Sequence, residues 1–275
     1  ANENPIIETV KTIIFALLLA GLFRSLFFQP FWIPSGSMKQ TLLIGDFIFV
    51  NKMVYGYSFA SCPGIPFTGI TPDKLCGFTK GGNKRLFGGL PQRGDVVVFR
   101  HPVNGSDYIK RLIGVPGDKV QMKNGHLILN GTPLEFNEDG TFSEAMAPQG
   151  SMGRRPRCSN GAIGQGGICE KERFVETLPD GPSYKTLNIN DRTRGDNTSV
   201  FSVPEGHYFF MGDNRDNSTD SRFPQVFDRS RQTGVGFVKY ENIIGRADRI
   251  IFSSAGKSMA YFWTWRKDRF FEAVE

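Results

Sequence analysis

The first 33 residues constrain the fold most strongly. Residues 13–23 are apolar or small without interruption, and after Arg24 the segment 26–33 is again mostly apolar. A stretch of about 20 such residues, here 12–33, is long enough to cross the hydrocarbon core of a bilayer. No small-x-small cleavage site follows it, and the aromatic run that includes Trp32 is typical of a membrane interface. We therefore expect an uncleaved N-terminal transmembrane helix, with a buried core helix as the alternative.

The rest of the chain is typical of a β protein. It contains 32 glycines, 16 prolines and 25 phenylalanines, and short apolar runs between turn residues predict strands. We expect a mostly β fold of antiparallel sheets behind the transmembrane helix. The predicted strands are 42–52, 95–100, 107–115, 119–122 and 126–129 around an Asn-Gly turn, 207–211, 235–238 and 243–251.

These patterns divide the chain into three parts. Residues 1–32 form the membrane anchor, and residues 33–130 and 204–275 form a catalytic β core. Residues 131–203 are less hydrophobic and are expected to form an inserted β-rich subdomain. The tail 259–271 mixes aromatic with basic residues, which suits a membrane surface or packing onto the core. The net charge of +6 fits anionic lipid but is too diffuse to indicate nucleic-acid binding.

Four cysteines flank two Gly/Pro-rich loops. Cys62 and Cys76 lie around the first loop, and Cys158 and Cys169 lie around the second. Without a nearby histidine or a C-x-x-C motif, this arrangement indicates two disulfides more than a zinc site. The pairing is not fixed by the sequence, and free thiols remain an alternative. Disulfides would place the chain beyond the anchor outside the cytosol.

Two serines, Ser35 and Ser37, lie in a Pro/Gly turn directly after the predicted anchor. A serine becomes a nucleophile when a base takes its proton, and no G-x-S-x-G motif or histidine context supplies one. A lysine can serve instead if burial lowers its pKa. Lys110 lies between apolar residues of the strand 107–115, and Arg111 beside it is expected to disfavour the charged amine further. Each residue alone also fits an ordinary turn or strand position.

Four motifs occur along the chain in a fixed order. They are IPSGSM at 33–38, TLLIGD at 41–46, YIKR at 108–111 with PGD at 116–118, and GDNRDNS at 212–218 with SR at 221–222. In this order they strongly resemble bacterial signal peptidase I, the membrane-anchored Ser/Lys endopeptidase. The resemblance covers the anchor and core strands but not residues 56–89 or 136–203. Gln40 departs from the pattern, because the family usually has proline there.

The resemblance implies a catalytic role for four residues. Ser37 matches the nucleophile and Lys110 the general base. Ser218 matches a hydroxyl that orients the lysine amine, as such a base requires. Ser35 matches a hydroxyl that forms the oxyanion hole together with the backbone N–H of Ser37.

The acidic run 212–222, which follows the predicted strand 207–211, is assigned a structural role. Asp220 and Arg222 match a buried ion pair near the site, and Asp213 is expected to shape the turn with Asn214. The alternative is a calcium loop, but the run lacks the glycine and terminal glutamate of an EF-hand. The chemistry implied here uses no metal and no cofactor.

The resemblance also implies the partners and location. The family cuts exported preproteins after a small-x-small sequence, with the substrate paired to a strand edge and alternate side chains in two pockets. Six bulky apolar residues are implied to form the walls of these pockets, and packing in the protein core explains the same residues equally well. The implied walls are Phe31, Ile33, Met38, Leu42, Tyr108 and Ile109.

The expected protein is thus a single-pass protease of the bacterial plasma membrane. Its catalytic domain is expected on the periplasmic, extracytoplasmic face, and membrane lipid is expected as its second partner. One alternative is a specialised relative that matures a pilin or conjugation protein. Another, from a different class, is a non-catalytic membrane-tethered β module that binds partners. Cleavage of a preprotein separates this module from the peptidase.

Overall fold

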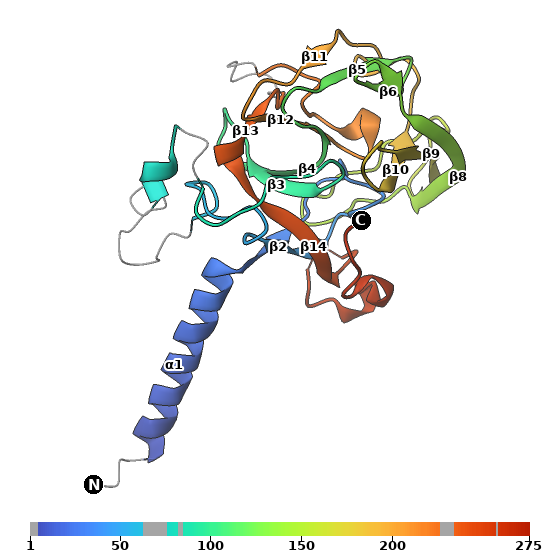
Figure 1. The fold of residues 1–275 in the computed structure, drawn as a ribbon. Coiled ribbons are helices and arrows are strands. Elements are labelled where there is room, and N and C mark those ends of the chain that lie inside the picture. The colour runs from blue at the N-terminus through green and yellow to red at the C-terminus, as the bar shows by residue number, and fades with distance from the viewer. Residues whose placement is uncertain (1–4, 63–75, 82–84, 226–233, 257) are drawn as a thin grey trace.

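The computed structural model describes residues 5–62, 76–81, 85–225, 234–256 and 258–275 of the chain. One long helix extends from a body of antiparallel strands (Figure 1). The mostly antiparallel β architecture predicted from the sequence is confirmed, because every paired strand in the three sheets runs antiparallel to its neighbour.

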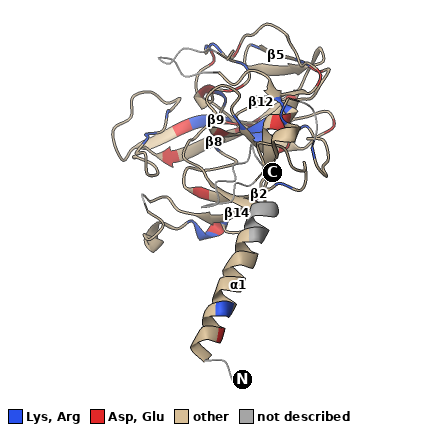
Figure 2. Cartoon of the chain, turned by 90° about the vertical axis from the view of Figure 1, so that its left-hand side faces the viewer, with Lys and Arg blue, Asp and Glu red and all other residues tan. Residues whose placement is uncertain are grey.

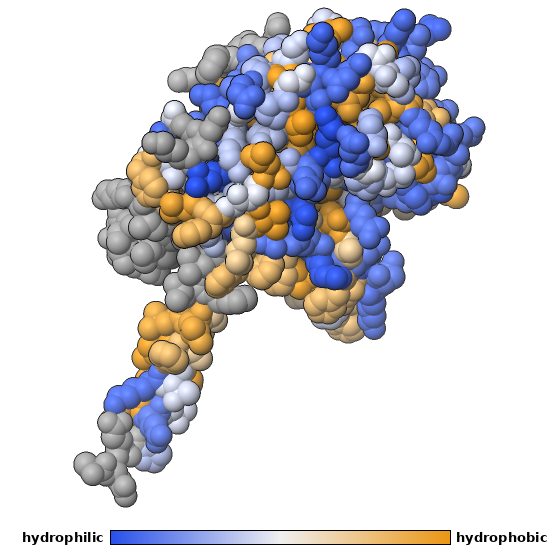
Figure 3. Space-filling view, viewed as in Figure 1, coloured by the Kyte–Doolittle hydropathy of each residue, from blue (hydrophilic) through white to orange (hydrophobic). Residues whose placement is uncertain are grey.

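The N-terminal helix α1 covers Pro5–Leu26. Proline is favoured at the first turn of a helix, and the Leu/Ala-rich run that follows has high helix propensity. Apolar side chains in the segment 6–19 are exposed along α1 (Figure 3). Among the helices of the described residues, none is at once long and apolar enough to cross a membrane.

The expectation that the apolar stretch continues as one span to Ile33 is wrong. The chain turns after Leu26, and strand β1 (Phe28–Trp32) pairs with β2 (Asp46–Asn51). Pro30 lacks the N–H that a helix interior requires, and the aromatic residues around it favour a strand. The aromatic run therefore belongs to the β body.

The largest sheet has seven strands in the order β1-β2-β14-β3-β4-β12-β13. Strand β4 is internal, as predicted, and its partners are β3 and β12. Most predicted strands are found within a few residues of their expected ends. The new bounds are β3 (Val96–Arg100), β4 (Asp107–Gly114), β12 (His207–Met211), β13 (Val238–Lys239) and β14 (Ile243–Ser253).

Two smaller sheets complete the body. One has the order β11-β5-β6-β7 and contains the predicted hairpin, and the other has the order β10-β9-β8. The strands of the first are β5 (Lys119–Lys123), β6 (His126–Leu129), β7 (Thr132–Pro133) and β11 (Phe201–Ser202). Those of the second are β8 (Glu135–Ala145), β9 (Ile168–Thr177) and β10 (Ser183–Asn188).

Both cysteine pairs are joined as disulfides, Cys62 to Cys76 and Cys158 to Cys169. The second disulfide joins Cys158, within the segment between β8 and β9, to Cys169 of β9. Beneath the large sheet, apolar side chains from β2, β3 and β14 pack together with Ile33 and Met38 from the turn after β1. The segment that carries the two serines is therefore attached to the core on both sides.

Candidate functional site

The turn with Ser35 and Ser37 is held by hydrogen bonds from two directions. On one side the Ile33 N–H donates to the carbonyl of Asp46 at 2.9 Å. On the other, the side-chain amide of Asn214 donates to the carbonyl of Gly36 at 2.8 Å, and its backbone N–H donates to the carbonyl of Ser37 at 3.1 Å. The GDNRDNS segment after β12 thus clamps the serine turn through Asn214.

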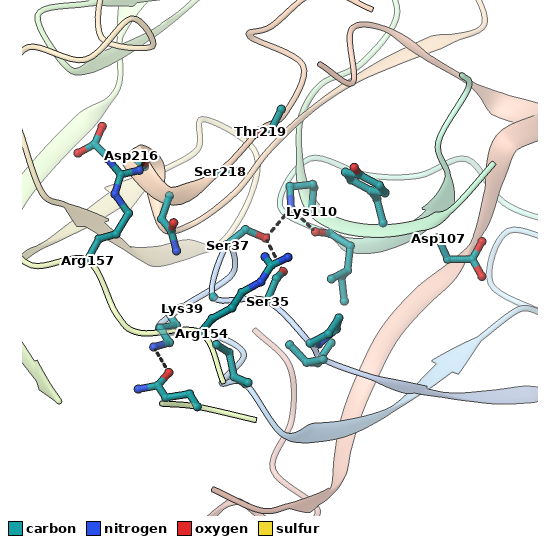
Figure 4. A pocket seen from close by; sticks show the side chains of 18 of the residues that line it. Ser35, Ser37, Lys39, Asp107, Lys110, Arg154, Arg157, Asp216, Ser218 and Thr219 are labelled. Atoms are coloured by element: carbon teal, nitrogen blue, oxygen red, sulfur yellow. Dashed lines mark hydrogen bonds between the residues drawn. The ribbon is translucent and has the colours of Figure 1, made fainter. Parts of the chain in front are cut away.

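Lys110 projects from β4 into this turn (Figure 4). Its Nζ lies 2.6 Å from the Oγ of Ser37 and 2.9 Å from the carbonyl oxygen of Ile109. The two residues are 73 positions apart in the chain, and both are buried. A neutral amine at this distance can accept the proton of the Ser37 hydroxyl.

The surroundings of Lys110 favour its neutral form. Burial away from water lowers the pKa of Lys110 to about 8, although the negative charges of Asp220 and Asp213 act in the opposite direction. The positive charge of Arg222 lowers the pKa further. Arg111, which was expected to disfavour the charged amine, is instead paired with a carboxylate, so that expectation is wrong.

Two buried ion pairs flank the site. Arg111 donates to both carboxylate oxygens of Asp213, at 2.9 and 2.8 Å. Arg222 does the same to Asp220, at 2.9 Å to each oxygen. Burial alone would raise the pKa of Asp220, but the Arg222 guanidinium and the hydrogen bond from the Gly212 N–H act in the opposite direction, and the pKa is lowered. Asp220 also accepts from the backbone N–H of Gly212 at 3.0 Å, so this pair fixes the backbone beside the site.

Ser35 and Ser218 line the same cleft as Ser37 and Lys110. The Oγ of Ser35 lies 3.4 Å from the Oγ of Ser37. The expected hydrogen bond between Ser218 and Lys110 is not formed among the described residues, where the amine contacts Ser37 and Ile109. The peptide bond before Gln40, where the family usually has proline, is cis.

The cleft encloses about 890 Å³. Four residues predicted to form its walls, Phe31, Ile33, Tyr108 and Ile109, line it. The other two predicted wall residues, Met38 and Leu42, are 1% and 0% exposed and belong to the core cluster beneath. The turn after Ser37 directs both side chains into the core, which fits the core-packing alternative for these two residues.

One buried charged cluster was missed by sequence reasoning. Lys39, two residues after Ser37, donates to Glu144 of β8 at 2.5 Å and to Gln149 at 2.7 Å. Lys171 of β9 pairs with the other oxygen of the same Glu144 carboxylate. Burial lowers the pKa of Lys39, against the opposing effect of Glu144. The only local signal was a lysine beside a buried turn, and its partner is 105 positions away.

The three aspartates of the acidic run face different partners, which does not fit a calcium loop. Asp213 and Asp220 hold arginines, and Asp216 accepts from the N–H groups of Ile189 and Asn190 at 2.7 and 3.0 Å. Within the described residues, no group of three or more His, Cys, Asp or Glu side chains could hold a metal ion.

Comparisons with a family model and with individual relatives indicate the same protein family. The family model described as signal peptidase, peptidase S26, matches residues 6–252. Signal peptidase I of Rickettsia typhi is 40% identical over 247 residues, which cover 87% of this chain and 78% of the relative. Signal peptidase I of Rickettsia prowazekii is 39% identical over 264 residues, which cover 92% and 83%.

Among solved structures, the chain is similar to a crystal structure of a signal peptidase I from Enterococcus faecalis. The two sequences are 28% identical, and the match covers 57% of this chain and 97% of that one with a TM-score of 0.30.

Proposed function

The chain belongs to the signal peptidase family, peptidase S26, and is a serine endopeptidase that removes signal peptides; we propose that Ser37 is its nucleophile and Lys110 its general base. The observation that supports this assignment is the 2.6 Å contact between the Lys110 amine and the Ser37 hydroxyl. Burial of the lysine lowers its pKa to about 8, so a useful fraction of the amine is neutral near neutral pH.

The proposed reaction starts with neutral Lys110 accepting the proton of Ser37 as its oxygen attacks the scissile carbonyl. The developing oxyanion receives hydrogen bonds from the Ser37 N–H and the Ser35 hydroxyl, a kind of stabilisation often worth a factor of about 100 or more per donor. The Lys110 ammonium then protonates the leaving amine, and an acyl-enzyme on Ser37 remains. Neutral Lys110 next activates a water molecule that hydrolyses this ester. Ser218, buried in the same cleft, is our candidate for orienting the amine.

Cleavage of a preprotein in detergent tests this assignment. We expect Ser37→Ala and Lys110→Met each to reduce kcat/KM at least about 1000-fold, as loss of a nucleophile or its base does. Lys123→Met on β5 is a matched control, because this exposed lysine lies in another sheet. Circular dichroism should report a folded protein in all three cases. Cleavage by either site variant at more than a few per cent of the wild-type rate would refute the assignment.

We propose that the substrate is an extended preprotein segment ending in a small-x-small sequence. The residues before the scissile bond would contact the apolar part of the cleft, which the bulky side chains of Phe31, Tyr108 and Ile109 line. Bulky apolar walls reject larger side chains, because overpacking is unfavourable. Replacing alanine by leucine at the residue before the bond should therefore abolish cleavage, and unchanged cleavage would contradict the pocket assignment.

We further propose that the chain is attached to the bacterial plasma membrane, with the β body on the periplasmic face. Helix α1 exposes apolar side chains over residues 13–19, and its charged residues Glu8 and Lys11 lie nearer its N-terminus (Figure 2). The tail exposes Tyr261, Phe262 and Trp263, and the red C-terminal part of the ribbon lies at the same end of the body as α1 (Figure 1). The two disulfides fit an oxidising compartment. Flotation with lipid vesicles tests attachment, and loss of flotation is expected for a chain that begins after Leu26.

The domain division is also proposed, with one boundary moved. The anchor ends at Leu26, because β1 pairs within the large sheet. The inserted subdomain is supported by β8, β9 and β10, which form a sheet of their own. The family relationship favours neither a non-catalytic binding module nor a protease specialised for pilin or conjugation proteins.

A further inference from the structure

The cleft has two chemically different parts. Apolar side chains, among them Tyr108 and Ile109, form one part beside Lys110. Exposed arginines that no part of the proposed reaction uses line the rest of the cleft. We call these four arginines the cationic rim: Arg154, Arg155, Arg157 and Arg194. Figure 4 shows Arg157 and Asp216 on one side of the Ser37–Lys110 pair, with Asp107 on the other side.

The positive charge of the rim is not neutralised by the protein. No ion pair involves any of the four arginines in the described part of the structure, and the cleft contains only two acidic side chains. Asp107 pairs with Arg100 at 3.5 Å. Asp216 accepts hydrogen bonds from two backbone N–H groups and from Thr193. Four like charges beside one cleft create a positive potential that attracts carboxylates.

The rim is built into the fold rather than scattered over the surface. Arg154, Arg155 and Arg157 lie in the segment between β8 and β9, directly before Cys158, which a disulfide joins to Cys169 of β9. The guanidinium of Arg157 donates to the carbonyl of Asp216 at 2.8 Å. Asp216 lies two residues before Ser218 in the chain. The hydrogen bond therefore ties the basic segment to the wall of the catalytic cleft.

We infer that the cationic rim binds acidic side chains in the first residues of the mature protein, directly after the scissile bond. This inference rests on the proposed function, in which the residues before the bond occupy the apolar part. An extended chain that passes Ser37 from that part continues toward the rim, since strands advance about 3.3 Å per residue. Asp or Glu side chains there meet exposed guanidiniums, which pair well with carboxylates.

Two versions of one preprotein test the inference. They differ only at the start of the mature part, where one has Ser and Gln residues and the other has Glu at two of those positions. We expect wild type in neutral detergent to cleave the acidic version about tenfold faster by kcat/KM, since each exposed ion pair contributes a few-fold. The ratio should fall as salt rises from about 50 to about 500 mM.

Charge variants assign the preference to the rim. Arg154→Glu with Arg194→Glu should reverse the preference, measured for the same variant as the ratio of kcat/KM for the acidic version to kcat/KM for the neutral version. Arg157 is left unchanged because of its bond to Asp216. Lys119→Glu with Lys123→Glu, two exposed residues of β5, changes the net charge equally and should keep the wild-type preference.

The outcomes separate the inference from the proposed function. If wild type cleaves neither version, the proposed function fails. If it cleaves both equally at low salt, or if the control pair reverses the preference as strongly as the rim pair, the inference is overturned. It is also overturned if the rim variant changes the rate only with vesicles containing anionic lipid and independently of substrate charge, because the rim then binds lipid headgroups.

Discussion

The rate of preprotein cleavage should rise with pH and level off near pH 8, because burial lowers the pKa of Lys110 to about 8. Below that point kcat/KM should increase about tenfold per pH unit, since only the neutral amine accepts the Ser37 proton. At pH 7 about a tenth of the molecules have a neutral Lys110. At the ordinary lysine pKa of 10.5 the fraction is about 0.03%. Burial thus raises the competent fraction about 300-fold, equivalent to about 3.4 kcal/mol.

The assay measures kcat/KM in detergent from about pH 6 to pH 10, with a preprotein that has no titratable group near the scissile bond. A second buried lysine must be separated from the first. Burial, together with the nearby charge of Arg100, also lowers the pKa of Lys52 to about 8. The Lys52→Met variant should keep the inflection, because Lys52 does not line the cleft.

Two results would refute the reasoning. A rate that continues to rise tenfold per unit beyond about pH 9.5 would mean that the base titrates like an exposed lysine. An inflection near pH 8 that disappears in Lys52→Met would mean that the titrating group lies outside the cleft. Either result would remove the physical basis for Lys110 as the base, even if its substitution abolished activity.

Three further predictions concern stability and geometry. Glu144→Gln leaves two buried lysines without their shared carboxylate and should lower the free energy of unfolding by about 3–5 kcal/mol; urea denaturation measures this, and a loss below about 1 kcal/mol would contradict it. Lys110→Met should be about 3 kcal/mol more stable than wild type at pH 7. This advantage should disappear as the pH rises from about 8 to above 10.5, because the unfolded lysine binds more protons than the folded one in that range; a pH-independent difference would refute this account. Gly212→Ala places a methyl group 2.6 Å from the Ser37 carbonyl and should reduce kcat more than it reduces thermal stability, whereas unchanged kcat would show that the turn can move.

The sequence was sufficient to predict the parts of the site that depend on local pattern. The apolar neighbours of Lys110 predicted a buried strand, and the structure places that strand inside the large sheet. The Ser37 turn and the GDNRDNS segment were assigned to the site from the family motifs. Their spacing in the chain does not show that Asn214 binds the turn. Their meeting depends on strand order, which local patterns do not determine.

Other features could not be predicted because they depend on distant or competing interactions. The pairing of Lys39 with Glu144 joins segments 105 positions apart, and Glu144 alone looks like an exposed strand residue. The end of α1 was placed too late because hydropathy does not separate an apolar helix from an apolar edge strand. Here Pro30 and the pairing of β1 with β2 outweigh the hydrophobic continuity.

The contrast between Lys110 and its charged neighbours explains why this one group can act as a base. Arg111 and Arg222 are equally buried, but each donates to both oxygens of a carboxylate, and such pairing stabilises the charged form. The amine of Lys110 contacts only neutral oxygens, those of Ser37 and Ile109. Desolvation is therefore not offset by a direct ion pair at Lys110. Because the arginines hold the nearby aspartates in their own pairs, those carboxylates act on Lys110 only from a distance, and its neutral amine remains able to accept the Ser37 proton.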